Sequence, residues 1–230
     1  MAMTMKMVLK ILTFQKMAKK DKIVLVGGGG HALSLLEVLR DPKAVRGYIA
    51  LEASPSLTLE WLGDDEAARG LRDDSLFHIA FVYSGLPVMA LRRKIIEKYE
   101  TMGARFASII APTAIVTRNA RIADGCAVMN GAIVNRAHIG RHVVVNTGAI
   151  VEHDCEIGSN TFIGPGAVMG GAVKIGSDCF IGLGSRIKNG VTIAPGITVG
   201  MGAVVTDDLR EPGIYHGNPL KFHSLKKIKK

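Results

Sequence analysis

The 230-residue sequence is poor in aromatic residues and has no long uninterrupted apolar run. Aromatic residues make up 5% of it, whereas 48% is hydrophobic and 27 residues are glycine. The apolar stretches are far too short to span a bilayer. The glycines indicate many tight turns, and the apolar content is too high for a disordered chain. We therefore expect a soluble, compact, β-rich protein of two domains.

Acidic residues are nearly absent from both ends of the chain, and the net charge of the whole is +9. Residues 1–22 hold six lysines and one aspartate, and residues 221–230 hold five lysines and no acid. Subtracting +5 for each end from +9 leaves −1 for everything between them. The folded part is therefore near neutral and the basic character belongs to the ends of the chain, so we expect no nucleic-acid partner.

The first 20 residues, MAMTMKMVLKILTFQKMAKK, mix apolar side chains with lysines. One interpretation is a short amphipathic basic helix at a membrane surface. A signal peptide is not expected, because lysines interrupt the apolar part and no small-residue cleavage site follows. The interpretation we favour is that translation starts at Met17, so that residues 1–21 are a tail and membrane association is unlikely.

Strands and helices alternate between residues 22 and 105. The segment KIVLV is typical of a buried strand. It is followed by GGGG, which is typical of a tight turn, and by HALSLLEVL, which is typical of an amphipathic helix. VRGYIA and FHIAFVY predict two further strands, and LPVMALRRKIIEKYE predicts a second helix. This alternation indicates a small α/β domain with a parallel sheet, a Rossmann-like unit.

From Ile110 onward a bulky aliphatic residue recurs at every sixth position, with one five-residue step between Val134 and Ile139. A six-residue period predicts a parallel β-helix, in which each hexad is one short face and three hexads close a triangular coil. We place this domain at residues 106–210 and a basic C-terminal tail at residues 211–230. The inward positions are Ile110, Val116, Ile122, Val128, Val134, Ile139, Val145, Val151, Ile157, Ile163, Met169, Ile175, Ile181, Ile187, Ile193, Val199 and Val205.

The fourth residue after each aliphatic is usually small, and all three cysteines, Cys126, Cys155 and Cys179, fall in this slot. A thiol there is most simply a small buried hydrophobe. We therefore expect no disulfide framework, no zinc site and no catalytic cysteine. A reducing, cytoplasmic compartment fits this use of cysteine.

The glycine turn also fits a loose dinucleotide fingerprint through Gly27, Gly29 and Ala32, so a dehydrogenase is one alternative. Another is a tight turn that binds nothing. The unit is too short for a full dinucleotide domain, and a β-helix has no obvious place in a dehydrogenase. We favour a turn whose backbone approaches phosphate groups at a helix N-terminus.

The hexad pattern resembles the hexapeptide-repeat acyltransferases, whose left-handed parallel β-helices assemble as trimers. Four segments resemble the sugar O- and N-acyltransferases of the sialic acid O-acetyltransferase type. These segments are VLVGGGGHALSLLEVL, NTGAIVEHDCEIG, GAVVTDDL and HGNPLK. The resemblance spans residues 22–222. It implies a homotrimer that transfers acetyl from acetyl-CoA to an amino group of a nucleotide-linked amino sugar in surface-glycan synthesis. The alternatives are transfer to a sugar hydroxyl, and a non-catalytic protein that binds a nucleotide sugar.

The resemblance also implies where the nucleotide sugar binds, within residues 22–105. In the family the glycine turn contacts the pyrophosphate, which carries over to Gly29, Gly30 and His31. Gly47 and Tyr48 match the glycine and the aromatic residue that the family often has after its second strand, and the resemblance implies that they also contact the substrate. The family often has acidic residues next, where this chain has alanine and leucine at positions 50 and 51.

Coenzyme A is implied to lie along the later coils, between neighbouring subunits. Glycines near the inward aliphatics leave room for its pantetheine arm. One position near the thioester departs from the family, which often has histidine where this chain has phenylalanine. The residues predicted to contact the cofactor are Phe162, Gly164, Gly170, Gly171, Gly182 and Gly200.

His153 lies near a corner of the predicted coil, between Glu152 and Asp154. Coil packing does not require a histidine there, so it is either a surface or interface residue or a catalyst. Histidine ionises near neutral pH, and this one coincides with the family's catalytic histidine in EHDC. The resemblance implies that its neutral imidazole takes a proton from the acceptor, while one of the two carboxylates orients the ring and backbone amides hold the oxyanion.

His138 and His142 flank the five-residue step, and with His153 they raise the alternative of a three-histidine metal site, as in the γ-class carbonic anhydrases. Their spacing does not resemble that class. We expect ordinary surface or interface histidines and no metal.

Deletion of residues 1–16 is expected to leave folding and activity intact, because the first predicted strand starts near Ile23. The soluble yield, melting temperature and acetyl-transfer rate of the truncated protein would be compared with those of the full chain. Loss of soluble protein would show that the segment is structural.

Overall fold

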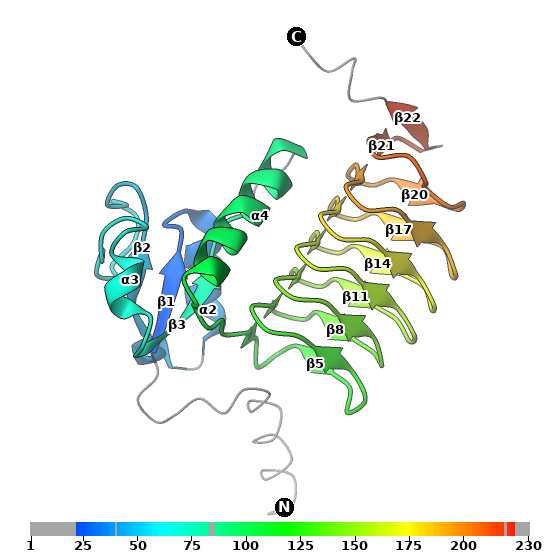
Figure 1. Ribbon diagram of the computed structural model, residues 1–230. Helices are drawn as coiled ribbons and strands as arrows, with labels where there is room; N and C mark the ends of the chain where they lie inside the picture. Colours follow the sequence, from blue (N-terminus) through cyan, green and yellow to red (C-terminus); the bar gives the residue numbers. More distant parts are fainter. Residues whose placement is uncertain (1–21, 40, 83–85, 219, 224–230) are drawn as a thin grey trace, which may run out of the picture.

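The computed structural model describes residues 22–39, 41–82, 86–218 and 220–223. The predictions for residues 1–21 and for the end of the C-terminal tail lie outside these residues. A small α/β unit is followed by a long stack of coils (Figure 1). No helix in the described part of the chain is long and apolar enough to cross a membrane.

The α/β unit is built on three parallel strands in the order β2-β1-β3. All three strands are largely buried, which suits a parallel sheet with helices on its faces. The elements are β1 (Lys22–Val26), α2 (Gly30–Val38), the 3₁₀ helix η1 (Pro42–Ala44), β2 (Val45–Ile49), α3 (Ala68–Leu71), β3 (Ser75–Ile79) and α4 (Leu86–Thr101).

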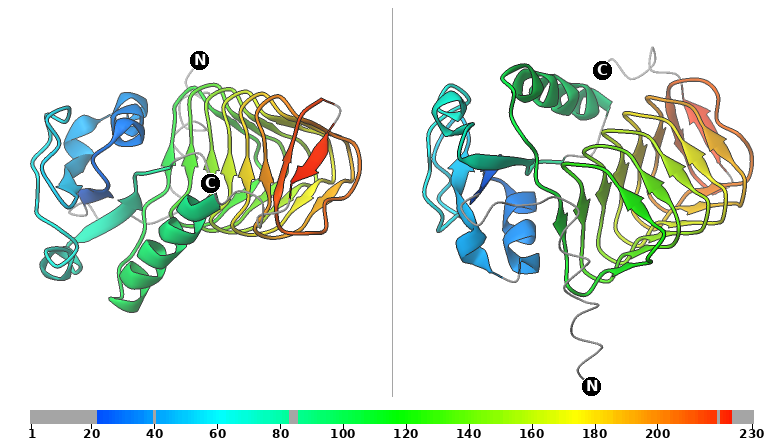
Figure 2. Two further views of the ribbon diagram at one scale, coloured as in Figure 1. Left: turned by 90° about the horizontal axis from the view of Figure 1, so that it is seen from above. Right: turned by 60° about the horizontal axis from the view of Figure 1, so that its bottom comes forward.

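The coils are made of two-residue strands that form three long parallel sheets, here called faces 1, 2 and 3 (Figures 1 and 2). Face 1 also carries the antiparallel pair β21 (Ile214–His216) and β22 (Lys221–His223). Face 1 comprises β4 (Ile109–Ile110), β7 (Ala127–Val128), β10 (Val144–Val145), β13 (Phe162–Ile163), β16 (Phe180–Ile181) and β19 (Thr198–Val199). Face 2 comprises β5 (Ile115–Val116), β8 (Ile133–Val134), β11 (Ile150–Val151), β14 (Val168–Met169), β17 (Arg186–Ile187) and β20 (Val204–Val205). Face 3 comprises β6 (Arg121–Ile122), β9 (His138–Ile139), β12 (Glu156–Ile157), β15 (Lys174–Ile175) and β18 (Thr192–Ile193).

The interior of the coils is the predicted aliphatic stack. All seventeen inward positions belong to one hydrophobic cluster, in which only the first three are less than fully buried. Strands on one face pair in register, so that Val145 lies beside Ile163 and Ile163 beside Ile181. The predicted β-helix of hexads is therefore confirmed.

The three cysteines are buried and free, as their slot in the repeat predicts. The thiol of Cys126 lies 3.0 Å from the carbonyl oxygen of Gly140, and the thiols of Cys155 and Cys179 face carbonyl oxygens of the next coil in the same way. Burial raises the pKa of Cys126 to about 12 and that of Cys179 to about 11. These thiols stay protonated and are poor nucleophiles.

The five-residue step is a shortened corner between faces 2 and 3. The next two corners on this edge have four residues, 152–155 and 170–173, whereas this one has three, residues 135–137. In each of them one residue has a left-handed backbone: Arg136 (φ 49°), Asp154 (φ 61°) and Ala172 (φ 58°). Because these residues are equivalent, the position that is missing is the one held by His153 in the following corner.

Helix α4 packs on the small sheet and is joined to the corner between faces 3 and 1 of the β-helix by a buried arginine. Arg92 is 1% exposed and donates to the carbonyl oxygen of His142 at 2.8 Å and to Oδ1 of Asn160 at 2.5 Å. Asn160 in turn donates to the carbonyl oxygen of Met89 and to Asp178. Arg93 pairs with Asp178 at 2.8 Å. The α/β unit is thus anchored by polar contacts as well as by apolar packing.

Asn160 should be among the most sensitive positions of this junction, because it is buried, bonded to a buried cation and left-handed at φ 54°. Asn160→Gly keeps the backbone conformation and removes the side chain, and we expect it to lower the free energy of unfolding by about 2 kcal/mol. Asn160→Ala adds the cost of a Cβ in that conformation, about a further 1 kcal/mol. Urea unfolding followed by circular dichroism measures both values. Equal stability of the two variants and the wild type would contradict this account.

Candidate active site

His153 lies at the corner between β11 on face 2 and β12 on face 3. The inward residues on either side, Val151 and Cys155, are buried in the coil, whereas the His153 side chain is 54% exposed. Its backbone oxygen accepts a hydrogen bond from Ala172 of the following coil at 2.8 Å. A rigid backbone therefore presents this imidazole to solvent.

The imidazole is paired with Asp154 and not with Glu152. Nδ1 of His153 lies 2.9 Å from Oδ2 of Asp154, and Oδ1 of Asp154 lies 3.3 Å from Nη2 of Arg136. The hydrogen bond from His153 holds the pKa of Asp154 below its usual range, and the positive charge of Arg136 acts in the same direction. An ionised Asp154 favours the tautomer in which Nδ1 carries the proton and Nε2 is free to accept one.

Glu152 is turned toward the preceding corner. Its Oε2 accepts from Nδ2 of Asn135 at 2.8 Å and from the backbone N–H of His153 at 3.2 Å. Glu152 therefore fixes the backbone of His153. The sequence did not indicate which of the two carboxylates orients the ring and which has this other role.

Gly171 lies directly beneath the imidazole on the following coil. A Cβ at this position would lie 2.5 Å from Cε1 and 2.6 Å from Nε2 of His153. The neighbouring Gly170 is covered in the same way by the side chain of Asn189. The ring of His153 thus packs on backbone atoms of the following coil. On the preceding coil, the shortened corner at residues 135–137 has no residue equivalent to His153.

The other predicted cofactor residues lie elsewhere in the protomer. Gly164, Gly182 and Gly200 start the corners between faces 1 and 2, where a Cβ would lie 2.5 to 2.7 Å from atoms of the next coil or of β21. Phe162 is on face 1, buried, and stacked on Phe180 with ring centroids 4.9 Å apart. One protomer does not bring these four residues to His153.

The glycine turn opens onto a cavity of about 550 Å³. Residues 27–31 line one side of it, together with the end of β2, residues 80–82, Asp65 and α4. Gly29 caps α2, so the positive end of that helix faces this region. Gly29, Gly30 and His31 therefore line the cavity at the N-terminus of α2.

His31 is neutral in this setting. Burial, aided by the positive charge of Arg92, lowers its pKa to about 4. Its Nε2 is buried and has no hydrogen-bond partner among the described residues. The imidazole is thus available to a ligand as a hydrogen-bonding group without a charge.

Gly47 and Tyr48 have packing roles beside this cavity. A Cβ on Gly47 would lie 2.5 Å from the carbonyl oxygen of Glu60. Tyr48 is 1% exposed, and its hydroxyl accepts from the backbone N–H of Ser54 at 2.7 Å. Neither residue lines the cavity, whereas Ala50 and Leu51 do.

Asp65 is a cavity residue that the sequence did not indicate. Its carboxylate pairs with Lys98 at 3.0 Å and accepts from the hydroxyl of Tyr99 at 2.9 Å. It comes from the long connection between β2 and α3, which has no repeat or motif that would mark it.

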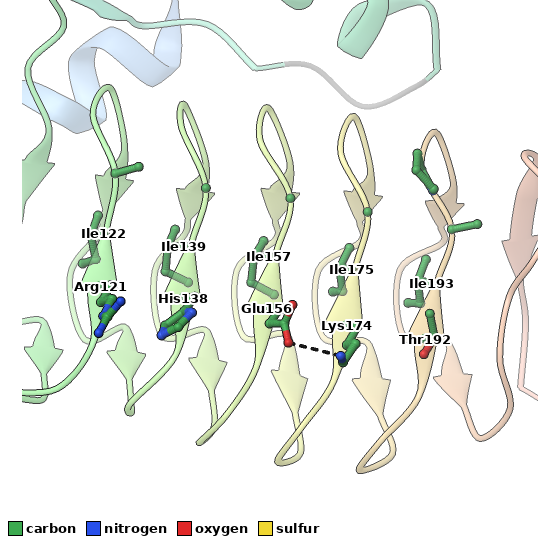
Figure 3. A pocket seen from close by; sticks show the side chains of 16 residues that line it. Arg121, Ile122, His138, Ile139, Glu156, Ile157, Lys174, Ile175, Thr192 and Ile193 are labelled. Carbon is green, nitrogen blue, oxygen red and sulfur yellow. Dashed lines mark ion pairs between the residues drawn. The ribbon is translucent and has the colours of Figure 1, made fainter.

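Face 3 carries a shallow groove of about 850 Å³ that runs across successive coils (Figure 3). Its outward side chains are polar, and Glu156 pairs with Lys174 at 3.2 Å. The labelled outward row in Figure 3 is Arg121, His138, Glu156, Lys174 and Thr192.

The three histidines considered as a metal site lie in different surroundings. His138 faces outward on face 3, whereas His142 is 2% exposed and packs edge-to-face on Phe106 with centroids 4.4 Å apart. Burial lowers the pKa of His142 to about 3. Within the residues that the structure describes, no group of three histidine, cysteine or acidic side chains is placed to hold a metal ion.

Comparison with known proteins agrees with this architecture. The family model described as bacterial transferase hexapeptide (six repeats) matches residues 136–171, which include His153. A variant of perosamine N-acetyltransferase from Caulobacter crescentus, solved with CoA and GDP-perosamine, is 33% identical, with 91% of this chain and 100% of that chain covered and a TM-score of 0.82.

Two further structures extend the likeness. The acetyltransferase domain of PglB from Neisseria gonorrhoeae, in complex with acetyl coenzyme A, is 27% identical over 89% of this chain and 100% of that chain, with a TM-score of 0.81. WeeI from Acinetobacter baumannii, at 22% identity over 88% and 99% of the two chains and a TM-score of 0.75, shares the fold. The repeat, the paired histidine and these matches agree, and the chain belongs to the hexapeptide-repeat sugar acetyltransferases, the family of perosamine N-acetyltransferase.

Proposed function

We propose that the protein transfers the acetyl group of acetyl-CoA to the amino group of a nucleotide-linked amino sugar. The observation that carries this proposal is the exposed imidazole of His153, oriented by Asp154 at 2.9 Å on the rigid corner of a β-helix. The relatives support the choice of substrates, because they include structures with CoA, acetyl coenzyme A and GDP-perosamine bound.

His153 acts as the general base. The amine nitrogen of the sugar attacks the thioester carbonyl carbon, and Nε2 of His153 takes the proton that the nitrogen loses. The proton on Nδ1 remains hydrogen-bonded to Asp154, whose negative charge stabilises the imidazolium. The tetrahedral intermediate, whose oxyanion backbone N–H groups stabilise, collapses with cleavage of the carbon–sulfur bond, and the thiolate of coenzyme A leaves and regains a proton. The product is an amide.

Residues 22–105 serve in this proposal as a Rossmann-like domain that holds the nucleotide sugar. The diphosphate lies at the N-terminus of α2, against the backbone of Gly29 and Gly30, where the helix dipole favours negative charge. The neutral His31 hydrogen-bonds to the ligand through Nε2. Gly47 and Tyr48 act by shaping the strand beside the cavity, and the apolar Ala50 and Leu51 border it.

Residues 106–210 form, in this proposal, a left-handed β-helix that assembles as a homotrimer. Face 1 is covered by the α/β unit and face 3 is polar, but the outward side chains of face 2 are mostly aliphatic. Ile115 is 57% exposed and Val168 is 38% exposed. An uncovered apolar strip of this kind marks a protein interface. The outward row of face 2 is Ile115, Ile133, Ile150, Val168, Arg186 and Val204.

A ring of three copies also explains how separate edges of the protomer form one cofactor site. The corner between faces 1 and 2 of one copy lies close to the His153 corner of its neighbour in such a ring. Gly164, Gly182 and Gly200 then face Gly170 and Gly171 across the cleft that holds coenzyme A. The three free buried cysteines fit a reducing compartment, and we place the reaction in the cytoplasm.

His153→Asn tests the catalytic role. The side chain is exposed, so the variant should keep the fold and the assembly, while turnover falls by about 10²- to 10⁴-fold. Acetyl-CoA binding, measured by calorimetric titration, should change little, because the imidazole acts on the acceptor. In the wild type the rate should rise with pH as the imidazole loses its proton. A free-thiol release assay with amino-sugar and hydroxyl acceptors measures turnover and acceptor choice together.

The matched control is His138→Asn, which removes an outward histidine on face 3 and should leave turnover unchanged. Near-native turnover of His153→Asn would contradict general-base catalysis by this residue. A wild-type protein that does not bind acetyl-CoA would support a non-catalytic sugar-binding role instead.

Ile150→Glu tests the proposed assembly. A carboxylate at this position of face 2, between the aliphatic Ile133 and Val168, would have to be buried in the interface without a partner, so we expect the trimer to dissociate and acetyl transfer to be lost, with an unchanged circular dichroism spectrum. Light scattering gives the oligomeric state. The control, Thr192→Glu on the polar face 3, should stay trimeric and active. A wild-type monomer at micromolar concentration would remove the proposed cofactor cleft.

A further inference from the structure

The shortened corner at residues 135–137 lies directly beside His153 on the preceding coil. It holds both of the carboxylates that flank this histidine. Nδ2 of Asn135 donates to Glu152 at 2.8 Å, and Glu152 accepts from the backbone of His153. Nη2 of Arg136 lies 3.3 Å from Asp154.

The two oxygens of Asp154 are divided between two donors. Oδ2 faces Nδ1 of His153 and Oδ1 faces Arg136. The backbone of Arg136 is held in place, because its N–H donates to Oγ1 of Thr117 at 2.8 Å. A guanidinium, a carboxylate and an imidazole therefore form one chain across the edge of two coils.

We propose that the shortened corner is part of the active site, with Arg136 and Asn135 as positioning residues that act on His153 through Asp154 and Glu152. Arg136 stops Asp154 from rotating away from Nδ1 and offsets part of its negative charge. Asn135 fixes Glu152 and through it the backbone of His153. This inference rests on the proposed role of His153 as general base.

The charges around His153 give the sign of the effect. Asp154 and Glu152 flank it on its own corner, Arg136 faces it from the preceding corner, and residues 170–172 of the following corner carry no charge. Without Arg136 the carboxylate of Asp154 stabilises the imidazolium more strongly, so the neutral base forms only at higher pH. The side chains of Arg136 and Asp154 are 59% and 56% exposed, so the effect is modest and screened by salt.

Arg136→Met in the full-length protein tests this inference through the pH dependence of kcat/KM for the amino-sugar acceptor. We expect the acidic limb of the profile to move to higher pH by about half a unit, and kcat on the plateau to fall several-fold. Arg136→Lys, which keeps the charge, should restore most of the wild-type profile.

Asn135→Ala is the second variant. It should lower kcat without moving the profile, because the amide carries no charge. Arg118→Met is the matched control, since Arg118 is an exposed arginine on the same edge, one coil further away. It should behave as the wild type does.

An unchanged profile and unchanged kcat for Arg136→Met, alongside an inactive His153→Asn, would overturn this inference and leave the proposed function standing. A fall in kcat of Arg136→Met with no movement of its acidic limb would also overturn the electrostatic role of Arg136. A fully active His153→Asn would instead overturn the proposed function.

Discussion

The aliphatic stack inside the β-helix is the interaction on which the rest of the structure depends. It places one inward residue per hexad and keeps each coil in register with the next, as between Val145 and Ile163. Backbone hydrogen bonds then run from corner to corner, including the bond from Ala172 to the carbonyl oxygen of His153. The corner is therefore rigid, although the imidazole that it carries is exposed. The proposed general base is in this way positioned without being buried, and burial would have disfavoured its charged form.

The junction between the α/β unit and the β-helix contains a buried cation. Arg92 is almost fully buried, and among the described residues its recorded partners are a carbonyl oxygen and an amide oxygen. Burial lowers its pKa to about 10, and its positive charge helps to lower the pKa values of His31 and His142. These histidines are neutral as a result. The same charge thus affects both the glycine-turn cavity and the β-helix corner on which α4 rests.

Sequence periodicity was enough to predict the β-helix, its inward residues and the burial of its cysteines. These features are local, because a hexad specifies the direction of each side chain within a few residues. Periodicity could not predict that Asp154 pairs with the ring while Glu152 pairs with Asn135, since that depends on contacts between coils. Nor could it indicate Asp65, which reaches the cavity from an irregular connection. Gly47 was predicted to contact a ligand, yet the structure uses it for close backbone packing.

The sequence by itself determined the repeat, the resemblance to the acetyltransferase family and the candidate histidine. Each of these depends on residues that are near one another in the chain. Only the tertiary structure decided which groups surround that histidine. Stacking brings residues about 18 positions apart into contact, so Arg136 meets Asp154, and Gly171 lies beneath His153. The five-residue step was visible in the sequence as an irregularity. That it lies beside His153 follows from the stacking of coils, which a linear pattern does not contain.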